Sequence, residues 1–322
     1  MYQTTNHILM VRPANFGFNE QTAESNAFQT NDTSLSQAEI SQKAIDEFDG
    51  FVAQLRSAGV NVIVGEDSPT PVKHDAIFPN NWVTFHEDGT VITYPMYAPM
   101  RRLERQEHIL QQIEDQFVTS KRFHLESAEA DNLFLEGTGS MIFDRPNKIV
   151  YACISPRTDV DILDKFCEIT GYKKVIFTSV DGNGQEIYHT NVMMALGETF
   201  CVICLETIQD TNERDAVETA LFETEKEIIE ISIAQMLEFA GNMLQVRNDK
   251  GETFLVMSGQ AYKSLTIRQI EQIKSHTNII SVPIYTIETY GGGSARCMMA
   301  EVFLRPHLNP PPETSGRTLN YK

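Results

Sequence analysis

The sequence predicts an α/β protein, and three observations lead to this class. Short apolar runs rich in Val, Ile and Phe recur along the 322 residues and are bounded by turn residues. Segments with the apolar spacing of amphipathic helices fall between several of these runs. The segment His-Glu-Asp-Gly-Thr at 86–90 has the composition of a hairpin turn, so the sheets cannot be purely parallel.

The expected elements follow from these patterns in chain order. Strands are expected at residues 8–11, 60–64, 82–86, 90–94, 141–143, 149–154, 174–178, 192–196, 200–205, 253–257, 279–282 and 297–304. Helices are expected at 37–57, 101–117, 158–170, 226–241 and 264–275, the first of them ending before Gly59. Pairs of strands alternate with single helices about every 50 to 70 residues, which predicts ββαβ-like units repeated around a centre.

Length and charge limit the classes of function. A chain of this length is either two average domains or one large domain, and no Pro/Ser/Gly-rich linker divides it. The formal net charge of −18 argues against nucleic acid and anionic membranes as partners. We find no signal-peptide pattern and no apolar stretch near about 18 residues, so we expect a cytoplasmic protein.

The five cysteines are odd in number and widely spaced, which is not a disulfide framework. Cys201 and Cys204 form a Cys-x-x-Cys pair, but they lie inside an apolar run and lack a second pair or suitably spaced histidines. We therefore expect a reducing compartment and no metal site.

Four polar clusters stand at the ends of expected strands. They are Phe-Pro-Asn-Asn-Trp at 78–82, Leu-Glu-Gly-Thr-Gly-Ser at 135–140, Tyr-His-Thr-Asn at 188–191 and Gly-Gly-Gly-Ser-Ala-Arg-Cys at 291–297. A cysteine, a histidine and a glutamate in separate segments are the ingredients for covalent catalysis at an electrophilic carbon. The glycines before Cys297 allow a ligand to approach closely, and Arg296 supplies charge that favours a thiolate. The alternative for Cys297 is a small hydrophobe in a buried strand.

Together the four clusters resemble the guanidine-modifying enzymes of the pentein superfamily, which includes arginine deiminases, dimethylarginine dimethylaminohydrolases and amidinotransferases. In this resemblance, which covers nearly the whole chain, Glu136 is the acidic residue, His189 the catalytic histidine and Cys297 the nucleophile. It implies a pentein α/β-propeller, a pseudo-fivefold ring of ββαβ units, as one catalytic domain over residues 1–305. The prolines at 306 and 310–312 predict that residues 306–322 form a tail outside this domain. The resemblance also implies chemistry without a cofactor.

Two departures from this pattern concern the substrate. Arginine deiminases carry aspartate where this chain has Asn81, and again where it has Asn191. A guanidinium offers only donors, whereas a neutral ureido group offers N–H donors and a carbonyl acceptor. Asparagine amides complement a ureido group without burying net charge. The pattern favours citrulline over arginine, with ornithine, carbon dioxide and ammonia as products.

The resemblance also implies a role for each residue. Cys297 attacks the ureido carbon to form a covalent thio-carbamoyl intermediate, His189 moves protons, and Glu136 holds a substrate nitrogen. The expected substrate-binding residues are Asn81 and Asn191 for the ureido head, Arg157 with Arg101 or Arg102 for the α-carboxylate, and Asn80 and Gly292 beside them.

Other interpretations remain open at this stage. Asn80 and Asn81 also suit a turn after a proline, and Arg101 and Arg102 suit the solvated start of a helix. The expected enzyme is a hydrolase of a small amino-acid substrate. The alternatives are an arginine or methylarginine deiminase, an amidinotransferase and a non-catalytic pentein binding protein. The sequence does not indicate an oligomeric state.

Overall fold

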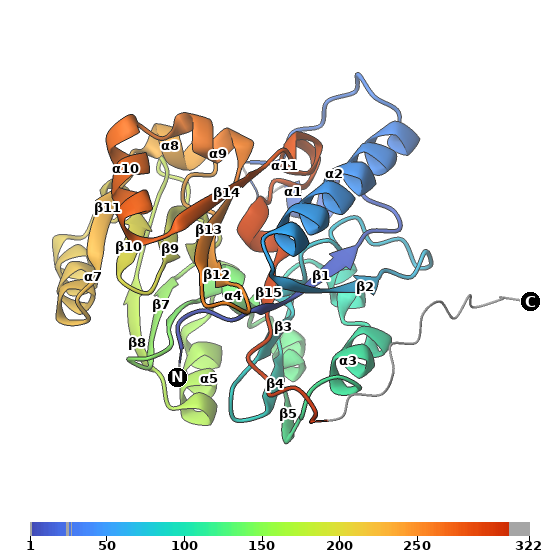
Figure 1. The fold of residues 1–322 in the computed structure, drawn as a ribbon, viewed down its shortest axis with the longest axis horizontal. Coiled ribbons are helices and arrows are strands. Elements are labelled where there is room, and N and C mark those ends of the chain that lie inside the picture. The colour runs from blue at the N-terminus through green and yellow to red at the C-terminus, as the bar shows by residue number, and fades with distance from the viewer. Residues whose placement is uncertain (1, 24–25, 27, 309–322) are drawn as a thin grey trace, which may run out of the picture.

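Five three-stranded sheets are arranged around a common centre in the computed structural model, which describes residues 2–23, 26 and 28–308. In every sheet the first strand is antiparallel to the middle strand, and the middle strand is parallel to the last. The connection from the middle strand to the last contains one helix of eight or more residues in every unit. Figure 1 shows these helices on the outside of the molecule. The expected pseudo-fivefold ring of ββαβ units is therefore confirmed.

The strands occupy equivalent places in the five units. The first strands are β15 (Ala300–Glu301), β3 (Val83–Phe85), β6 (Ile142–Asp144), β9 (Met194–Leu196) and β12 (Leu244–Arg247). The middle strands are β1 (His7–Arg12), β4 (Thr90–Thr93), β7 (Ile149–Cys153), β10 (Phe200–Ile203) and β13 (Thr253–Ser258). The last strands are β2 (Asn61–Glu66), β5 (Lys121–His124), β8 (Lys173–Phe177), β11 (Glu227–Glu230) and β14 (Asn278–Val282).

The connecting helices form where local sequence favours them. They are α2 (Gln37–Ser57), α3 (Glu107–Glu114), α5 (Val160–Thr170), α7 (Thr211–Glu223) and α10 (Ile267–His276). Helix α2 begins at a capping box formed by Ser36 and Glu39, and it buries the stripe that includes Ile40, Ala44 and Phe48. Helix α5 ends at Gly171, whose φ of 73° suits a glycine. Apolar helix faces thus cover the outside of the sheets.

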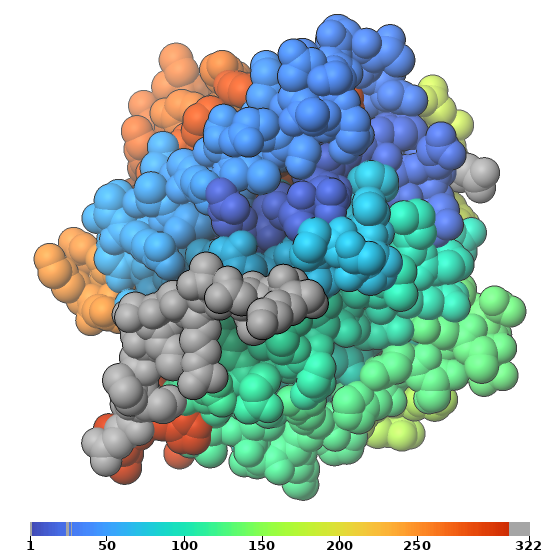
Figure 2. Space-filling view, turned by 90° about the vertical axis from the view of Figure 1, so that its right-hand side faces the viewer, coloured from blue at the N-terminus to red at the C-terminus, as the bar shows by residue number. Residues whose placement is uncertain are grey.

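The two ends of the described chain close the ring. Strand β15 pairs with β1 at Ile8 and Glu301, while β1 pairs with β2 from His7 and Asn61 onward. The first sheet is therefore built from both ends of the sequence. In the side view of Figure 2, the blue residues of this first unit lie directly against the cyan and green residues of the second.

Several sequence expectations are wrong in detail. The expected helix at 226–241 is instead strand β11 followed by the five-residue helix α8 (Ile233–Leu237), because the segment pairs in parallel with β10. The expected helix at 101–117 is split into the 3₁₀ helix η2 (Pro99–Glu104) and α3. Strand β15 covers only two residues of the expected strand at 297–304, and Cys297 lies in the preceding 3₁₀ turn. Of the expected tail, residues 309–322 lie outside the described residues.

A short turn precedes each first strand, and we call these five segments the inner turns. They are η1 (Pro79–Asn81), α4 (Gly137–Ser140), α6 (Thr190–Met193), residues 241–243 and η5 (Ala295–Met298). The turn η1 contacts α4 and η5, and α4 contacts α6. The fold thus brings segments that are more than 200 positions apart in the sequence to one place. Among the described residues, no helix has the length and apolar character required to cross a membrane.

Candidate active site

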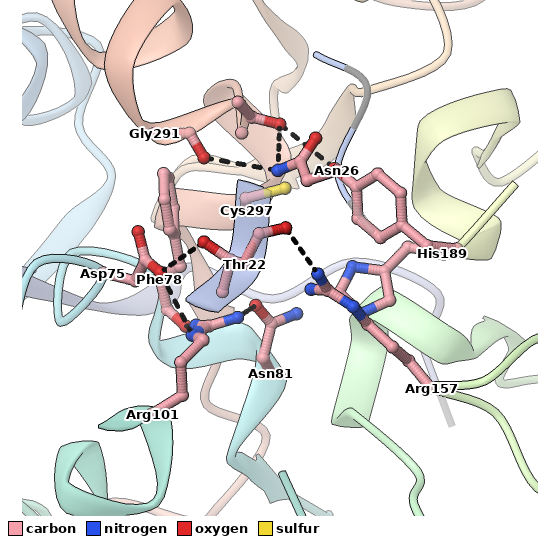
Figure 3. A pocket seen from close by; sticks show the side chains of 13 residues that line it. Thr22, Asn26, Asp75, Phe78, Asn81, Arg101, Arg157, His189, Gly291 and Cys297 are labelled. Carbon is pink, nitrogen blue, oxygen red and sulfur yellow. Dashed lines mark hydrogen bonds and ion pairs between the residues drawn. The ribbon is translucent and has the colours of Figure 1, made fainter. Parts of the chain in front are cut away.

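Asn81 of η1, Cys297 of η5 and His189, the residue before α6, line a common pocket. Its wall also includes two residues of the segment between β1 and α2, and the glycines 291–293 at the end of α11 (Tyr285–Gly291) and directly after it. Figure 3 shows Cys297, His189 and Asn81 directed toward this space, together with Arg101 and Arg157. The lining residues are Thr22, Asn26, Asp75, Phe78, Asn81, Arg101, Arg157, Tyr188, His189, Gly291, Gly292, Gly293 and Cys297.

Glu136 and His189 form a buried pair, of which His189 lines the pocket. Each residue immediately precedes a short inner turn, Glu136 before α4 and His189 before α6. The His189 Nε2 atom lies 2.7 Å from Glu136 Oε2, and the backbone N–H of Tyr97 donates to the other carboxylate oxygen at 2.9 Å. Burial lowers the pKa of His189 to about 4, against the opposing effect of Glu136. The imidazole is therefore neutral near pH 7 and able to accept a proton.

Glu136 stays ionised although it is fully buried. Arg157 Nη1 lies 3.5 Å and Arg101 Nη1 3.8 Å from its Oε2 atom. Burial alone would raise the pKa of this carboxyl, but Arg157, His189 and Arg101 together lower it well below its ordinary value. The carboxylate can therefore accept hydrogen bonds at neutral pH.

Cys297 is 6% exposed and faces the pocket from η5. Its sulfur lies 3.5 Å from Asn191 Nδ2 and 3.2 Å from Asn242 Nδ2. Arg296 interacts with Cys297 through its charge but not through a hydrogen bond, because its guanidinium donates to Met299 O and to Glu301 Oε2 at 2.7 and 2.9 Å. The hydrogen-bonding neighbours of the sulfur among the described residues are neutral amides.

Arg101 fixes the orientation of Asn81. The guanidinium binds Glu104 through two hydrogen bonds of 2.9 Å and donates from Nη1 to Asn81 Oδ1 at 2.9 Å. Because a guanidinium only donates, the atom of Asn81 that faces Arg101 must be its oxygen. The Nδ2 atom of Asn81 is buried without a hydrogen-bond partner among the described residues, and Figure 3 shows it directed into the pocket.

Gly292 has the backbone geometry that only glycine adopts easily. Its φ is 61°, and a Cβ atom there would lie 2.6 Å from Asn26 Nδ2. Its carbonyl accepts a hydrogen bond from the Tyr188 hydroxyl at 3.1 Å. The glycine run therefore allows the chain to turn from α11 into η5 with its backbone against the pocket wall.

The structure brings most of the residues expected from the sequence to this pocket. Of the three uncertain positions, Arg101 lines it, whereas Arg102 is partly exposed and donates to the carbonyls of Met96 and Tyr97. Asn80 is fully buried, does not line the pocket, and its side-chain amide has no partner among the described residues.

Sequence reasoning missed Asp75, Tyr188, Asn242 and the N-terminal residues Thr22 and Asn26. Asp75 is 2% exposed, and its Oδ1 atom has no hydrogen-bond partner within the described part of the chain. Asn242 follows Gly241 and precedes a first strand, as the other polar clusters do, and this repeated position is the signal that could have found it. No comparable signal marks Thr22 or Asn26, because they come from a segment outside the repeat.

This fold and this site define a pentein hydrolase that acts on carbon–nitrogen bonds. The family model for eukaryotic N,N dimethylarginine dimethylhydrolase matches residues 12–304. The chain belongs to this family. No curated protein matches the sequence significantly.

Solved structures share the fold. One is the product-bound N-terminal domain of ArgZ, an arginine dihydrolase of the ornithine-ammonia cycle in Cyanobacteria. Its sequence is 17% identical to this chain and the TM-score is 0.70, and the match covers 92% of this chain and 97% of that domain. The match to a longer ArgZ chain has a TM-score of 0.72 at 17% identity and covers 94% of this chain but 41% of that one. A dimethylarginine dimethylaminohydrolase bound to S-methyl-L-thiocitrulline is 14% identical with a TM-score of 0.64, covering 92% and 99%.

Proposed function

We propose that this protein hydrolyses citrulline to ornithine, carbon dioxide and ammonia through a covalent intermediate on Cys297. The amide of Asn81 is the observation that carries the choice of citrulline. Its oxygen is held by Arg101, so that only an N–H donor is available to a ligand. A ureido carbonyl accepts such a hydrogen bond, whereas a guanidinium has no acceptor to offer. If a guanidinium bound here, the Asn81 N–H would face another N–H donor in a buried site, which costs binding free energy.

The acceptors around the reacting carbon fit the other side of a ureido group. Asn191 Oδ1 is buried and has no hydrogen-bond partner among the described residues. The nitrogen of the same amide faces the Cys297 sulfur. Glu136 offers its ionised carboxylate beside His189. We assign these two groups to the N–H donors of the ureido head, with the carbonyl oxygen on Asn81.

Charged side chains suit the amino-acid end of the substrate. Arg157 lines the pocket and lies over the ring of Tyr188, with its guanidinium carbon 4.7 Å from the ring centre. We assign the α-carboxylate to Arg157, because a guanidinium binds a carboxylate through paired hydrogen bonds. We assign the α-ammonium to Asp75, whose unpartnered Oδ1 would otherwise remain a buried carboxylate oxygen without a donor.

The reaction needs only these side chains and water. Neutral His189 takes the thiol proton of Cys297, and the sulfur forms a bond to the ureido carbon. One carbon–nitrogen bond breaks as His189 returns the proton to the departing nitrogen, which leaves a thio-carbamoyl group on the sulfur. Water, deprotonated by His189, adds to this carbon and releases the thiolate. The resulting carbamic acid loses carbon dioxide to free the second nitrogen, so the net products are the same whichever nitrogen departs first.

Product analysis tests this function. The purified protein is incubated separately with citrulline, arginine and dimethylarginine, and ornithine, citrulline, ammonia and dimethylamine are quantified. We expect ornithine and ammonia from citrulline at a rate far above that with the other two compounds. Citrulline formed from arginine or dimethylarginine, with no turnover of citrulline itself, would contradict the proposal and favour a deiminase-type reaction.

We further propose that the protein works in the cytoplasm as an enzyme of free amino acids. All five cysteines are unpaired in the structure, as a reducing compartment requires.

A further inference from the structure

We propose that Asn242 is an additional catalytic residue, whose side-chain N–H stabilises the Cys297 thiolate. Asn242 is 1% exposed and belongs to the inner turn at 241–243. Its Nδ2 atom lies 3.2 Å from the Cys297 sulfur, closer than the 3.5 Å between this sulfur and Asn191 Nδ2. The inference deepens the proposed function and relies on it only for the role of Cys297 as nucleophile.

The orientation of the Asn242 amide follows from its two backbone partners. Its Oδ1 atom accepts the N–H of Arg296 at 3.1 Å, and its Nδ2 atom donates to the carbonyl of Asn191 at 2.9 Å. A backbone N–H can only donate and a carbonyl can only accept, so the amide cannot be reversed without the loss of both bonds. The second hydrogen of Nδ2 is then left for the sulfur. The oxygen of the same amide lies farther from the sulfur, at 3.6 Å, where a neutral thiol would be the donor.

Close packing holds this amide in place. A Cβ atom at Gly241 would collide with the carbonyl oxygen of Val192, so a glycine is required for the turn to approach α6. Asn242 thereby links α6, which carries Asn191, to η5, which carries Cys297. Its donor reaches the nucleophile from a rigid frame in which both of its other partners are backbone atoms.

No charged side chain among the described residues is hydrogen-bonded to the sulfur, so the neutral donors matter here. Arg296 is engaged with Glu301, and the ring nitrogen His189 Nε2 is engaged with Glu136. Within the described residues, the side chains hydrogen-bonded to the sulfur are the amides of Asn191 and Asn242. A donor of fixed orientation favours the thiolate over the thiol, because hydrogen bonds to charged atoms are the stronger ones.

The alkylation rate of Cys297 by iodoacetamide tests this role without any substrate. The intact protein is labelled near pH 7 and the modified peptide is quantified by mass spectrometry. We expect Asn242→Ala to slow labelling about tenfold. Asn248→Ala is the matched control, because Asn248 is also buried but its amide binds Ala58 O and Glu252. This control is expected to label at the wild-type rate.

A second variant keeps the test decisive if Asn242→Ala does not fold. Asn242→Asp preserves side-chain shape and the acceptor for the Arg296 N–H, but it replaces the donor with a charged oxygen beside the sulfur. We expect slower labelling than for Asn242→Ala near neutral pH and recovery of the rate in alkaline solution, where a purely structural defect would persist. Labelling of folded Asn242 variants within about twofold of wild type would overturn the inference.

Citrulline turnover separates this inference from the proposed function. If the wild-type protein hydrolyses citrulline, we expect Asn242→Ala to lower kcat with KM nearly unchanged. If it does not hydrolyse citrulline, the alkylation rates still decide whether Asn242 activates the thiol. Normal turnover together with an unchanged alkylation rate in Asn242→Ala would reject this inference alone.

Discussion

The inner turns and the outer helices belong to the same five units but differ in what they carry. The inner turns place polar side chains at the centre, which include Asn81, Asn191, Asn242 and Cys297, and Glu136 and His189 directly precede two of these turns. The outer helices carry none of the pocket-lining residues. On the outer helix α7 even a large apolar side chain, Phe222, is 82% exposed.

This difference shows how a repeated architecture becomes a catalytic site. Strand pairing and helix packing are repeated in each unit, and they hold the start of every first strand near the common centre. One chemically distinct residue in each turn, or directly before it, then produces an asymmetric site inside a nearly symmetric frame. Substitutions in the inner turns should therefore change chemistry, whereas those on the outer helices should change little.

The largest effect is expected at the nucleophile. Cys297→Ser should lower kcat for citrulline at least about 10⁴-fold, because a hydroxyl beside a neutral imidazole and two amides is a far weaker nucleophile than a thiolate. Phe222→Ser is the matched control on α7 and should leave kcat unchanged and stability within about 0.5 kcal/mol. Steady-state kinetics and urea unfolding measure the two quantities. Full activity of Cys297→Ser would remove this cysteine from the mechanism.

A smaller but more specific effect is expected for Asn81→Asp. The carboxylate still accepts the Arg101 hydrogen bond, but the donor toward the ureido carbonyl is replaced by an acceptor. We expect kcat/KM for citrulline to fall about 1,000-fold, because a site built to donate loses its partner and gains a repulsive charge. Competition assays should show improved binding of arginine relative to citrulline. An unchanged preference would mean that Asn81 does not read the ureido oxygen.

The smallest effect, on stability, is expected at Glu288 of α11, which contacts Ser294 three residues before Cys297. This residue is 1% exposed, accepts a hydrogen bond from Ser294 Oγ at 2.6 Å, and has a pKa raised by burial from 4.5 to about 7. The folded protein therefore binds this proton more tightly than the unfolded chain does. The resulting stability is complete below about pH 4.5 and is lost as the pH rises through about 7.

Glu288→Gln removes this titration and keeps an acceptor for Ser294. The variant should gain about 2 to 3 kcal/mol of stability relative to wild type between pH 5 and pH 8. Urea unfolding at these two pH values measures the change. Parallel pH profiles of the two proteins would show that Glu288 does not titrate in this range.

The parts of the site that could be predicted are those with an unusual residue in a distinctive setting. Cys297 after three glycines, His189 and Glu136 stood out because their types and order match one chemistry. Asn242 did not, because a Gly-Asn pair before the polar strand β12 has the appearance of an ordinary turn. Its role depends on contacts with Asn191 and Cys297, which only the folded ring brings together.

The fold shows the same division between local and tertiary causes. The buried middle strands β1, β7 and β13 were predicted from continuous apolar sequence, because both of their faces pack inside the protein. Strands β5 and β11 were missed because their sequences, Lys-Arg-Phe-His and Glu-Ile-Ile-Glu, are charged and partly exposed. These strands form because they pair in parallel with β4 and β10, a tertiary effect that local propensity does not reveal.

The orientation of Asn81 toward the substrate is the central claim, and a crystal structure of Cys297→Ala with bound citrulline tests it most directly. We predict that Asn81 Nδ2 donates to the ureido oxygen, with Asn191 Oδ1 and Glu136 accepting from the ureido nitrogens and Arg157 on the α-carboxylate. A ureido nitrogen against the Asn81 amide nitrogen, or citrulline bound outside this pocket, would contradict the assignment of citrulline as substrate.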